Sequence, residues 1–107
     1  MVLNYHKIGN GAKILLAFHG IGHDFSCFMH FAEVFSERYA TYLFDLPFHG
    51  KHIHQDLFVV TKQLWKDSLV QFLEKENIQE FDVIGFSIGG RFALATFEAF
   101  AARINHV

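Results

Sequence analysis

Three continuous apolar runs divide the chain, and longer segments with apolar residues at helical spacing lie between them. The runs cover Lys13–Phe18, residues 41–46 and residues 81–86. Short apolar runs bounded by Gly or Pro are typical of strands buried on both faces of a parallel sheet. We therefore predict that these three segments are interior strands.

The segments between the runs repeat apolar residues every three or four positions, which predicts helices. The first helix extends to about Arg38, and its apolar stripe follows the i, i+3, i+4, i+7 pattern: Phe28, Phe31, Ala32 and Phe35. Further helices are predicted over about 57–77 and from Ile88 to about Arg103. The last of them is apolar on nearly every side, so we expect other elements to cover more than one of its faces.

The N-terminal residues 2–8 alternate weakly between polar and apolar and end at Gly9-Asn10-Gly11, which is a reverse-turn signal. This pattern predicts an antiparallel hairpin between residues 2–8 and Lys13–Phe18. At the other end, residues 105–107 resemble the approach to a further strand. The alternation of strands and helices predicts a three-layer α/β/α domain. Its sheet is expected to be mainly parallel, with the second strand from the N-terminus antiparallel.

Composition limits the possible function classes. Of the 107 residues, 51% are hydrophobic and 19% are charged, which favours one globular domain over residues 1–107 rather than a disordered chain. The 9 Lys and Arg residues are scattered, so nothing indicates a nucleic-acid partner. No apolar segment is long enough for a membrane span. The single cysteine, Cys27, excludes an intrachain disulfide and favours the cytoplasm.

The most informative motif is G-x-S-x-G at Gly85-Phe86-Ser87-Ile88-Gly89. It follows an apolar run and precedes a predicted helix, and this strand–turn–helix context is what a nucleophile elbow requires. Ser87 is therefore a candidate nucleophile, and the backbone N–H of Ile88 is a candidate oxyanion donor. We expect glycine at 85 and 89 because larger residues would collide where strand and helix pack closely.

Two further motifs follow the other interior strands. His19-Gly20 comes after the first, and Asp45-Leu46-Pro47-Phe48-His49-Gly50 comes after the second. Together with the elbow, their order and spacing resemble the N-terminal half of the α/β-hydrolase superfamily, in particular its small esterase and acyl-hydrolase-like members. The resemblance extends from about Leu3 to Val107. It implies that residues 13–18 lie between residues 41–46 and 81–86 in the sheet.

The resemblance also implies roles for individual residues. Ser87 matches the nucleophile, and the N–H groups of Ile21 and Ile88 match the oxyanion donors. His19 and Gly20 belong to the loop that shapes the oxyanion hole, while Asp45 and His49 match positions that hold loops together. The family commonly has Gly at the position of Phe48, and Ser soon after Gly50 where this chain has Lys51-His52. The triad acid and base of the family follow the serine at positions beyond residue 107.

Histidines allow two other readings. His19, His23, His49, His52 and His54 all lie in predicted loops on the same sheet edge as Ser87, where ligands bind in open α/β sheets. His23 is the best placed of them to act as a substitute base, although loop histidines bonded to backbone are more common. The spacing of His49, His52 and His54, with Asp56 nearby, also admits a zinc site, but it matches no specific metal motif. We predict neither a metal nor another cofactor.

The function predicted from sequence is a serine hydrolase acting on a small carboxylic ester, thioester or related acyl substrate. Without the acid and base, this chain is expected to be inactive or weakly active, because an unassisted serine hydroxyl is a poor nucleophile. The alternative is a non-catalytic scaffold or binding protein that retains the fold. Phe86 and Phe48 flank the predicted site as candidate walls of an acyl pocket. The strand at 81–86 is expected to have an unpaired edge, which favours self-association.

Overall fold

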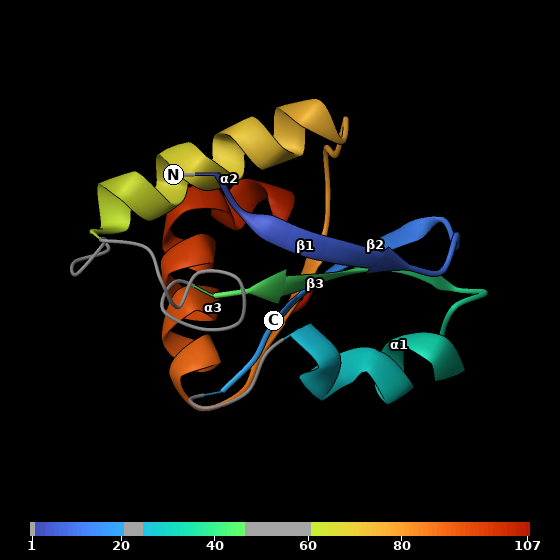
Figure 1. Ribbon diagram of the computed structural model, residues 1–107. Coiled ribbons are helices and arrows are strands. Elements are labelled where there is room, and N and C mark those ends of the chain that lie inside the picture. The colour runs from blue at the N-terminus through green and yellow to red at the C-terminus, as the bar shows by residue number, and fades with distance from the viewer. Residues whose placement is uncertain (1, 21–24, 47–60) are drawn as a thin grey trace.

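The computed structural model describes residues 2–20, 25–46 and 61–107 (Figure 1). Within these residues, the sheet has four strands in the spatial order β1-β3-β2-β4. The strands are β1 (Asn4–Ile8), β2 (Lys13–Phe18), β3 (Tyr39–Asp45) and β4 (Asp82–Gly85). β2 pairs in parallel with β3 on one side and with β4 on the other. The prediction that residues 13–18 lie between the other two apolar runs is therefore confirmed.

The predicted hairpin between the first two strands is wrong. β1 instead pairs antiparallel with β3, with Tyr5 opposite Phe44 and Ile8 opposite Thr41. The antiparallel strand is thus the first strand of the chain and not the second. The turn after β1 also forms a hydrogen bond to a segment other than β2: the Asn10 N–H donates to the Ser36 carbonyl over 3.1 Å. β1 is only half-buried, which suits an edge strand, whereas the last four residues of β2 are fully buried.

Helices cover both faces of the sheet (Figure 1). On one face lie α2 (Lys62–Lys75) and α3 (Ile88–Phe100), and on the other lies α1 (Met29–Val34), which follows the 3₁₀ turn η1 (Phe25–Phe28). The larger core cluster lies on the α2–α3 face and includes many buried aromatic and branched side chains: Leu16, Phe18, Tyr42, Phe44, Trp65, Leu69, Phe72 and Leu73. A smaller cluster of Ala17, Ala32 and Leu43 joins α1 to the opposite face. The predicted three-layer α/β/α architecture is confirmed.

The helices are shorter than predicted. α1 ends at Val34, and of its predicted apolar stripe only Ala32 is fully buried, while Phe31 and Phe35 remain 39% and 37% exposed. The described part of the second helix begins at Lys62, where the Thr61 hydroxyl caps it by accepting a hydrogen bond from the Leu64 N–H over 3.0 Å. Residues 57–60 of the predicted range lie outside the described residues.

The helix α3 ends at Phe100 and continues as one 3₁₀ turn, η3 (Ala101–Arg103). The sheet and α2 cover two of its sides, and the Trp65 indole of α2 donates to the buried Thr96 hydroxyl over 2.9 Å. Leu94 and Phe97 are nevertheless 60% and 43% exposed. The expected cover on more than one face is therefore confirmed, and Leu94 and Phe97 mark the part of α3 that stays exposed.

The residues after η3 lie beside β4, so the predicted approach to another strand is confirmed. Ile104 forms a parallel bridge with Phe81, and the Val83 N–H donates to the His106 carbonyl over 2.9 Å. The expectation of a wholly unpaired β4 edge is wrong, because its first half is already paired. Among the described helices, none has the length and apolar character that a membrane crossing requires.

Candidate active site

Ser87 lies in the tight turn between β4 and α3 with a strained backbone. Its φ of 58° and ψ of −120° fall in a region that residues with a Cβ rarely adopt. Such a conformation costs on the order of 1–3 kcal/mol and persists only where its surroundings enforce it. Ser87 occupies the N-cap of α3, yet its side chain makes no capping hydrogen bond and the residue is exposed. The turn therefore presents the hydroxyl outward rather than using it to cap the helix.

Close backbone contacts enforce this turn. A Cβ on Gly85 would lie only 2.3 Å from the Gly89 carbonyl oxygen. A Cβ on Gly89 would lie 2.1 Å from the carbonyl oxygen of Phe18, at the end of β2. Both distances are far shorter than van der Waals contact, so β4, the first turn of α3 and the end of β2 meet through backbone atoms alone. The turn that holds Ser87 is thereby fixed against the carboxyl end of β2.

The start of α3 offers a favourable environment for an anion. Ile88 is its first residue, and a helix provides no acceptor for its first N–H groups. Gly89 and Gly90 donate to the carbonyls of Phe86 and Ser87, both over 2.9 Å, whereas the Ile88 N–H has no acceptor among the described residues. The first turn contains no acidic side chain, so the positive end of the helix dipole is not neutralised. The arrangement suits stabilisation of a developing negative charge beside Ser87.

His19 joins the loops that follow β2 and β3. It is buried, and its Nε2 accepts a hydrogen bond from the Leu46 N–H over 2.9 Å. Its Nδ1 lies 2.8 Å from the Gly20 carbonyl oxygen. Because the Leu46 amide can only donate, Nε2 is the acceptor and Nδ1 carries the proton that Gly20 accepts. Both ring nitrogens are therefore engaged, and His19 is not free to act as a base towards Ser87.

Asp45 is the last residue of β3 and precedes Leu46, so it lies at the same sheet edge as His19. It is buried and interacts with other residues of the protein. The remaining loop residues considered above lie outside the described part of the chain: Ile21, His23, Phe48, His49, His52, His54 and Asp56. The roles of Ile21 and His49 accordingly stay predictions, and the substitute-base and zinc readings concern residues outside the described ranges. In the described ranges, no three His, Cys, Asp or Glu side chains group closely enough to hold a metal ion.

Ser87 also borders a groove along the outer side of β4. Its volume is about 580 Å³, and its walls combine small and apolar residues with a single cation: Ile84, Gly85, Gly90, Arg91, Ala93, Leu94 and Val107. The groove runs past the second half of β4, where pairing with the C-terminal residues has ended. The elbow thus stands at an open side of the sheet.

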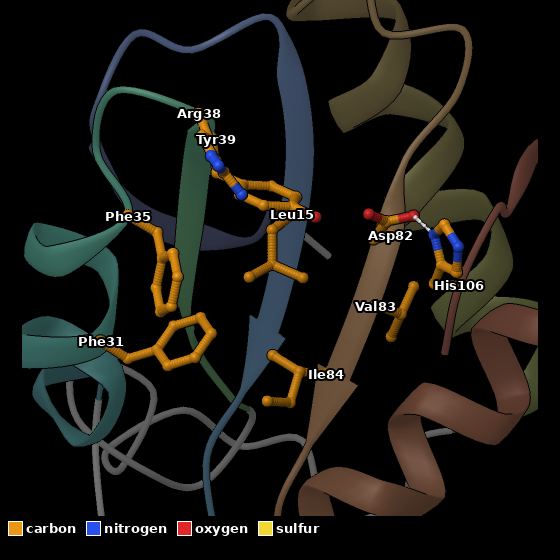
Figure 2. A pocket seen from close by; sticks show the side chains of 9 residues that line it. All are labelled: Leu15, Phe31, Phe35, Arg38, Tyr39, Asp82, Val83, Ile84 and His106. Carbon is orange, nitrogen blue, oxygen red and sulfur yellow. Dashed lines mark hydrogen bonds and ion pairs between the residues drawn. The ribbon is translucent and has the colours of Figure 1, made fainter.

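A second cleft, which the sequence did not reveal, lies between α1 and β4 (Figure 2). Its volume is about 380 Å³, and Phe31, Phe35 and Ile84 supply apolar walls. At its rim the His106 Nδ1 lies 3.1 Å from Asp82 Oδ1, a pair drawn as a dashed line in Figure 2. Asp82 begins β4, so this pair lies near the amino ends of the parallel strands, away from Ser87. No local pattern could have indicated a contact between residues 24 positions apart.

Comparison with known proteins identifies the family. The model of the alpha/beta hydrolase fold family matches residues 13–107, which is most of the chain. This chain belongs to the α/β-hydrolase fold family. The resemblance inferred from the three motifs is therefore confirmed. The G-x-S-x-G turn, His19–Gly20 and Asp45 lie at the carboxyl ends of the three parallel strands.

Individual relatives are considerably longer than this α/β hydrolase chain. A marine microorganism esterase superposes with a TM-score of 0.83 at 23% identity, over 97% of this chain and 39% of its own. Naproxen esterase from Bacillus subtilis superposes with a TM-score of 0.79 at 20% identity, over 94% of this chain and 35% of its own. A dihydrolipoyllysine-residue acetyltransferase component of an acetoin cleaving system from Cupriavidus necator is 28% identical over 88 residues, 82% of this chain and 23% of that protein. The chain thus spans less than half the length of these relatives.

Proposed function

We propose that this protein is a serine hydrolase of the α/β-hydrolase type, and that Ser87 attacks the carbonyl carbon of a small carboxylic ester, thioester or related acyl compound. The observation that carries the proposal is the strained, exposed Ser87 at the N-terminus of α3. A structural serine in a capping position would satisfy the helix N–H groups with its hydroxyl, and Ser87 does not. The esterases among the structural relatives support an acyl substrate.

In the proposed reaction the Ser87 oxygen bonds to the carbonyl carbon and the carbonyl oxygen becomes an oxyanion. The N–H of Ile88 donates to that oxyanion, and the predicted second donor is the N–H of Ile21. A base must accept the hydroxyl proton, and His19 is already engaged at both nitrogens. The longer relatives contain a part of the α/β-hydrolase fold that residues 1–107 do not cover. We propose that the base and the acid lie in that part of the fold. Residues 1–107 would then be the N-terminal part of an α/β-hydrolase fold that ends at the strand after the nucleophile helix.

The chain alone should therefore react slowly. With the oxyanion site and binding but no general base, a residual acceleration of roughly 10³–10⁴ over water is expected, by analogy with triad knockouts. Stoichiometric labelling is a more sensitive measurement than turnover in this situation. A small fluorophosphonate bonds irreversibly to a serine oxygen, with fluoride as the leaving group, so its adduct accumulates even where the reaction is slow.

The test is to incubate the folded protein with the fluorophosphonate and to locate the adduct by peptide mass spectrometry. We expect modification at Ser87, its loss in Ser87→Ala, and unchanged modification in the matched control Ser36→Ala. A denatured sample controls for non-specific reaction and should react much more slowly. If the folded protein reacts at Ser87 no faster than the denatured protein, the serine-hydrolase proposal fails.

The alternative is a non-catalytic scaffold, favoured by one observation: His19, whose backbone lies against Gly89 of the elbow, is committed through its ring to Leu46 and Gly20. A scaffold would retain the α/β-hydrolase architecture without a reactive serine. A cooperatively folded protein whose Ser87 does not react with the probe would support this alternative over the enzyme.

A further inference from the structure

Arg91 supplies the single positive charge among the described residues that line the groove beside Ser87. Its side chain is exposed, and in the part of the chain that the structure describes, no hydrogen bond or ion pair engages its guanidinium. The other arginine at the far end of α3 behaves differently, because Arg103 donates to the carbonyls of Gln79 and Ile78. Arg91 therefore holds no other element of the described fold in place.

The position of Arg91 on α3 brings it close to the candidate nucleophile. Ser87 is the N-cap of this helix, and Arg91 is its fourth residue, about 6 Å further along the axis. The Gly90 N–H donates to the Ser87 carbonyl over 2.9 Å, which closes the first turn between them. Both residues border the same groove of about 580 Å³. A molecule whose carbonyl carbon lies at Ser87 therefore passes Arg91 when it follows this groove.

The charges around this groove favour an anion. Among the described residues, no carboxylate lines it, and the first turn of α3 contains no acidic side chain. Glu98, the acidic residue of α3, forms an ion pair with Lys62 over 3.0 Å. A guanidinium binds a carboxylate through two parallel N–H donors, which adds geometric specificity to the charge attraction. A carboxylate that enters the groove would therefore meet Arg91 without competition from an acidic side chain of α3.

We propose that Arg91 determines substrate specificity: the acyl group that Ser87 attacks carries a carboxylate, and the Arg91 guanidinium binds it. The substrate class is then the half-esters or half-thioesters of short dicarboxylic acids. The apolar walls Ile84, Ala93 and Leu94 suit the methylene chain between the two carbonyl carbons. An acyl group stays on the serine until it is hydrolysed, so a contact with its carboxylate acts in both steps. This inference rests on the proposed function.

The expected size of the effect follows from the exposure of Arg91. A hydrogen bond to a charged group changes an equilibrium by roughly ten- to a hundredfold where solvent is excluded. Solvent screens an exposed ion pair, so we expect less, about fivefold, for discrimination between an acyl group with a carboxylate and a neutral acyl group of equal length. The neutral acyl group contacts only the apolar walls, so its own rate should not depend on Arg91.

The test compares the p-nitrophenyl half-ester of adipic acid with the p-nitrophenyl ester of hexanoic acid, whose acyl groups differ only in a terminal carboxylate or methyl group. In the reaction the Ser87 oxygen bonds to the carbonyl carbon, p-nitrophenolate leaves, and the hydroxyl proton passes to the buffer. Nitrophenolate release gives the rate, peptide mass spectrometry locates the acyl group, and Ser87→Ala gives the background. Arg91→Gln should lower the ratio of the adipoyl rate to the hexanoyl rate about fivefold, and Arg91→Lys should lower it less. Higher ionic strength should lower this ratio in the wild type but not in Arg91→Gln.

Lys66→Gln is the matched control, because it removes an exposed positive charge of α2 that does not line the groove, and its rate ratio should equal that of the wild type. The urea midpoints of all variants should agree, since both side chains are exposed. An unchanged ratio in Arg91→Gln, or an equal fall in Lys66→Gln, would overturn the role of Arg91, while reaction of Ser87 with the hexanoyl ester would leave the serine-hydrolase proposal intact. If neither ester modifies Ser87 faster in the folded than in the denatured protein, the serine-hydrolase proposal fails and the role of Arg91 fails with it.

Discussion

Two adjacent glycines in the first turn of α3 should respond oppositely to the same substitution. At Gly89 a Cβ would lie 2.1 Å from the Phe18 carbonyl oxygen, whereas at Gly90 a Cβ would have no neighbour within 4 Å. A methyl group at 89 must therefore push the helix away from β2 by roughly 1 Å or deform the turn. The same methyl group at 90 enters open space in a helix.

The magnitudes follow from packing and helix propensity. Replacing a helical Gly by Ala favours the helix by roughly 0.8–1 kcal/mol, and this gain should appear undiminished in Gly90→Ala. Overpacking typically costs about 1–3 kcal/mol, and more where backbone atoms must move, so Gly89→Ala should be destabilised by about 1–2 kcal/mol or more after that gain. We expect the two variants to differ by at least about 2 kcal/mol in the free energy of unfolding.

Urea unfolding followed by the fluorescence of Trp65 measures this difference. Trp65 is the single tryptophan of the chain. It lies on α2, is buried, and packs against Phe92 of α3, so its emission reports the packing of α3. With a slope of about 1–3 kcal/mol per molar urea, the midpoints should differ by roughly 1 M. If the two variants unfold within about 0.5 kcal/mol of each other, the backbone contact between the elbow and β2 is not what fixes Ser87. Gly89→Ala should also lose the modification of Ser87 by fluorophosphonate.

Three further predictions follow from the structure. Ser87→Gly should stabilise the fold by about 1 kcal/mol or more, because glycine relieves the positive φ, while abolishing modification of the site; unchanged stability in urea would contradict the strain. Burial first, and then hydrogen bonds to Glu76, raise the pKa of Tyr5 and of Tyr42 from 10.0 to about 12. The stability that these two raised pKa values contribute is fully present below pH 10 and is lost as pH rises from 10 to about 12. The free energy of unfolding, measured across this pH range, should therefore decline, and the decline should be smaller in the variant Tyr5→Phe/Tyr42→Phe. The chain should self-associate through the exposed apolar residues beside β4, and Leu94→Lys should shift its sedimentation towards the monomer; a wild type that is monomeric at all concentrations would refute this.

The elements that the sequence predicted well are those that local patterns determine. The continuous apolar runs mark interior strands because burial on both faces removes the usual alternation, and β2 shows this in its four consecutive buried residues. The elbow could be predicted because Gly85 is required by close contacts within the strand–turn–helix unit itself, whereas Gly89 is required by its contact with Phe18 of β2. Ser87, Gly85 and Gly89 are therefore recognisable as one motif in the sequence alone.

The predictions that failed depend on choices between distant segments. Residues 2–8 and the following turn favour a hairpin locally. In the folded sheet, however, β2 pairs with β3 and β4 on its two sides, and β1 pairs with β3 at the edge. The apolar stripe of α1 similarly suggested burial, yet Phe31 and Phe35 line an open cleft. The predicted helical spacing identifies a face of the helix, but it does not determine whether another element covers that face.

The partial pairing of β4 has a consequence for local stability. The Val83 amide is protected by its hydrogen bond to His106, and alternation along a parallel strand directs the Gly85 amide to the same outer side, where the ladder has ended. Amide hydrogen exchange should therefore be slow at Val83 and fast at Gly85 within one short strand. Local opening of the sheet would begin at the end nearest the elbow. The strand that leads to Ser87 is consequently anchored at its start and is most readily loosened at the end nearest Ser87.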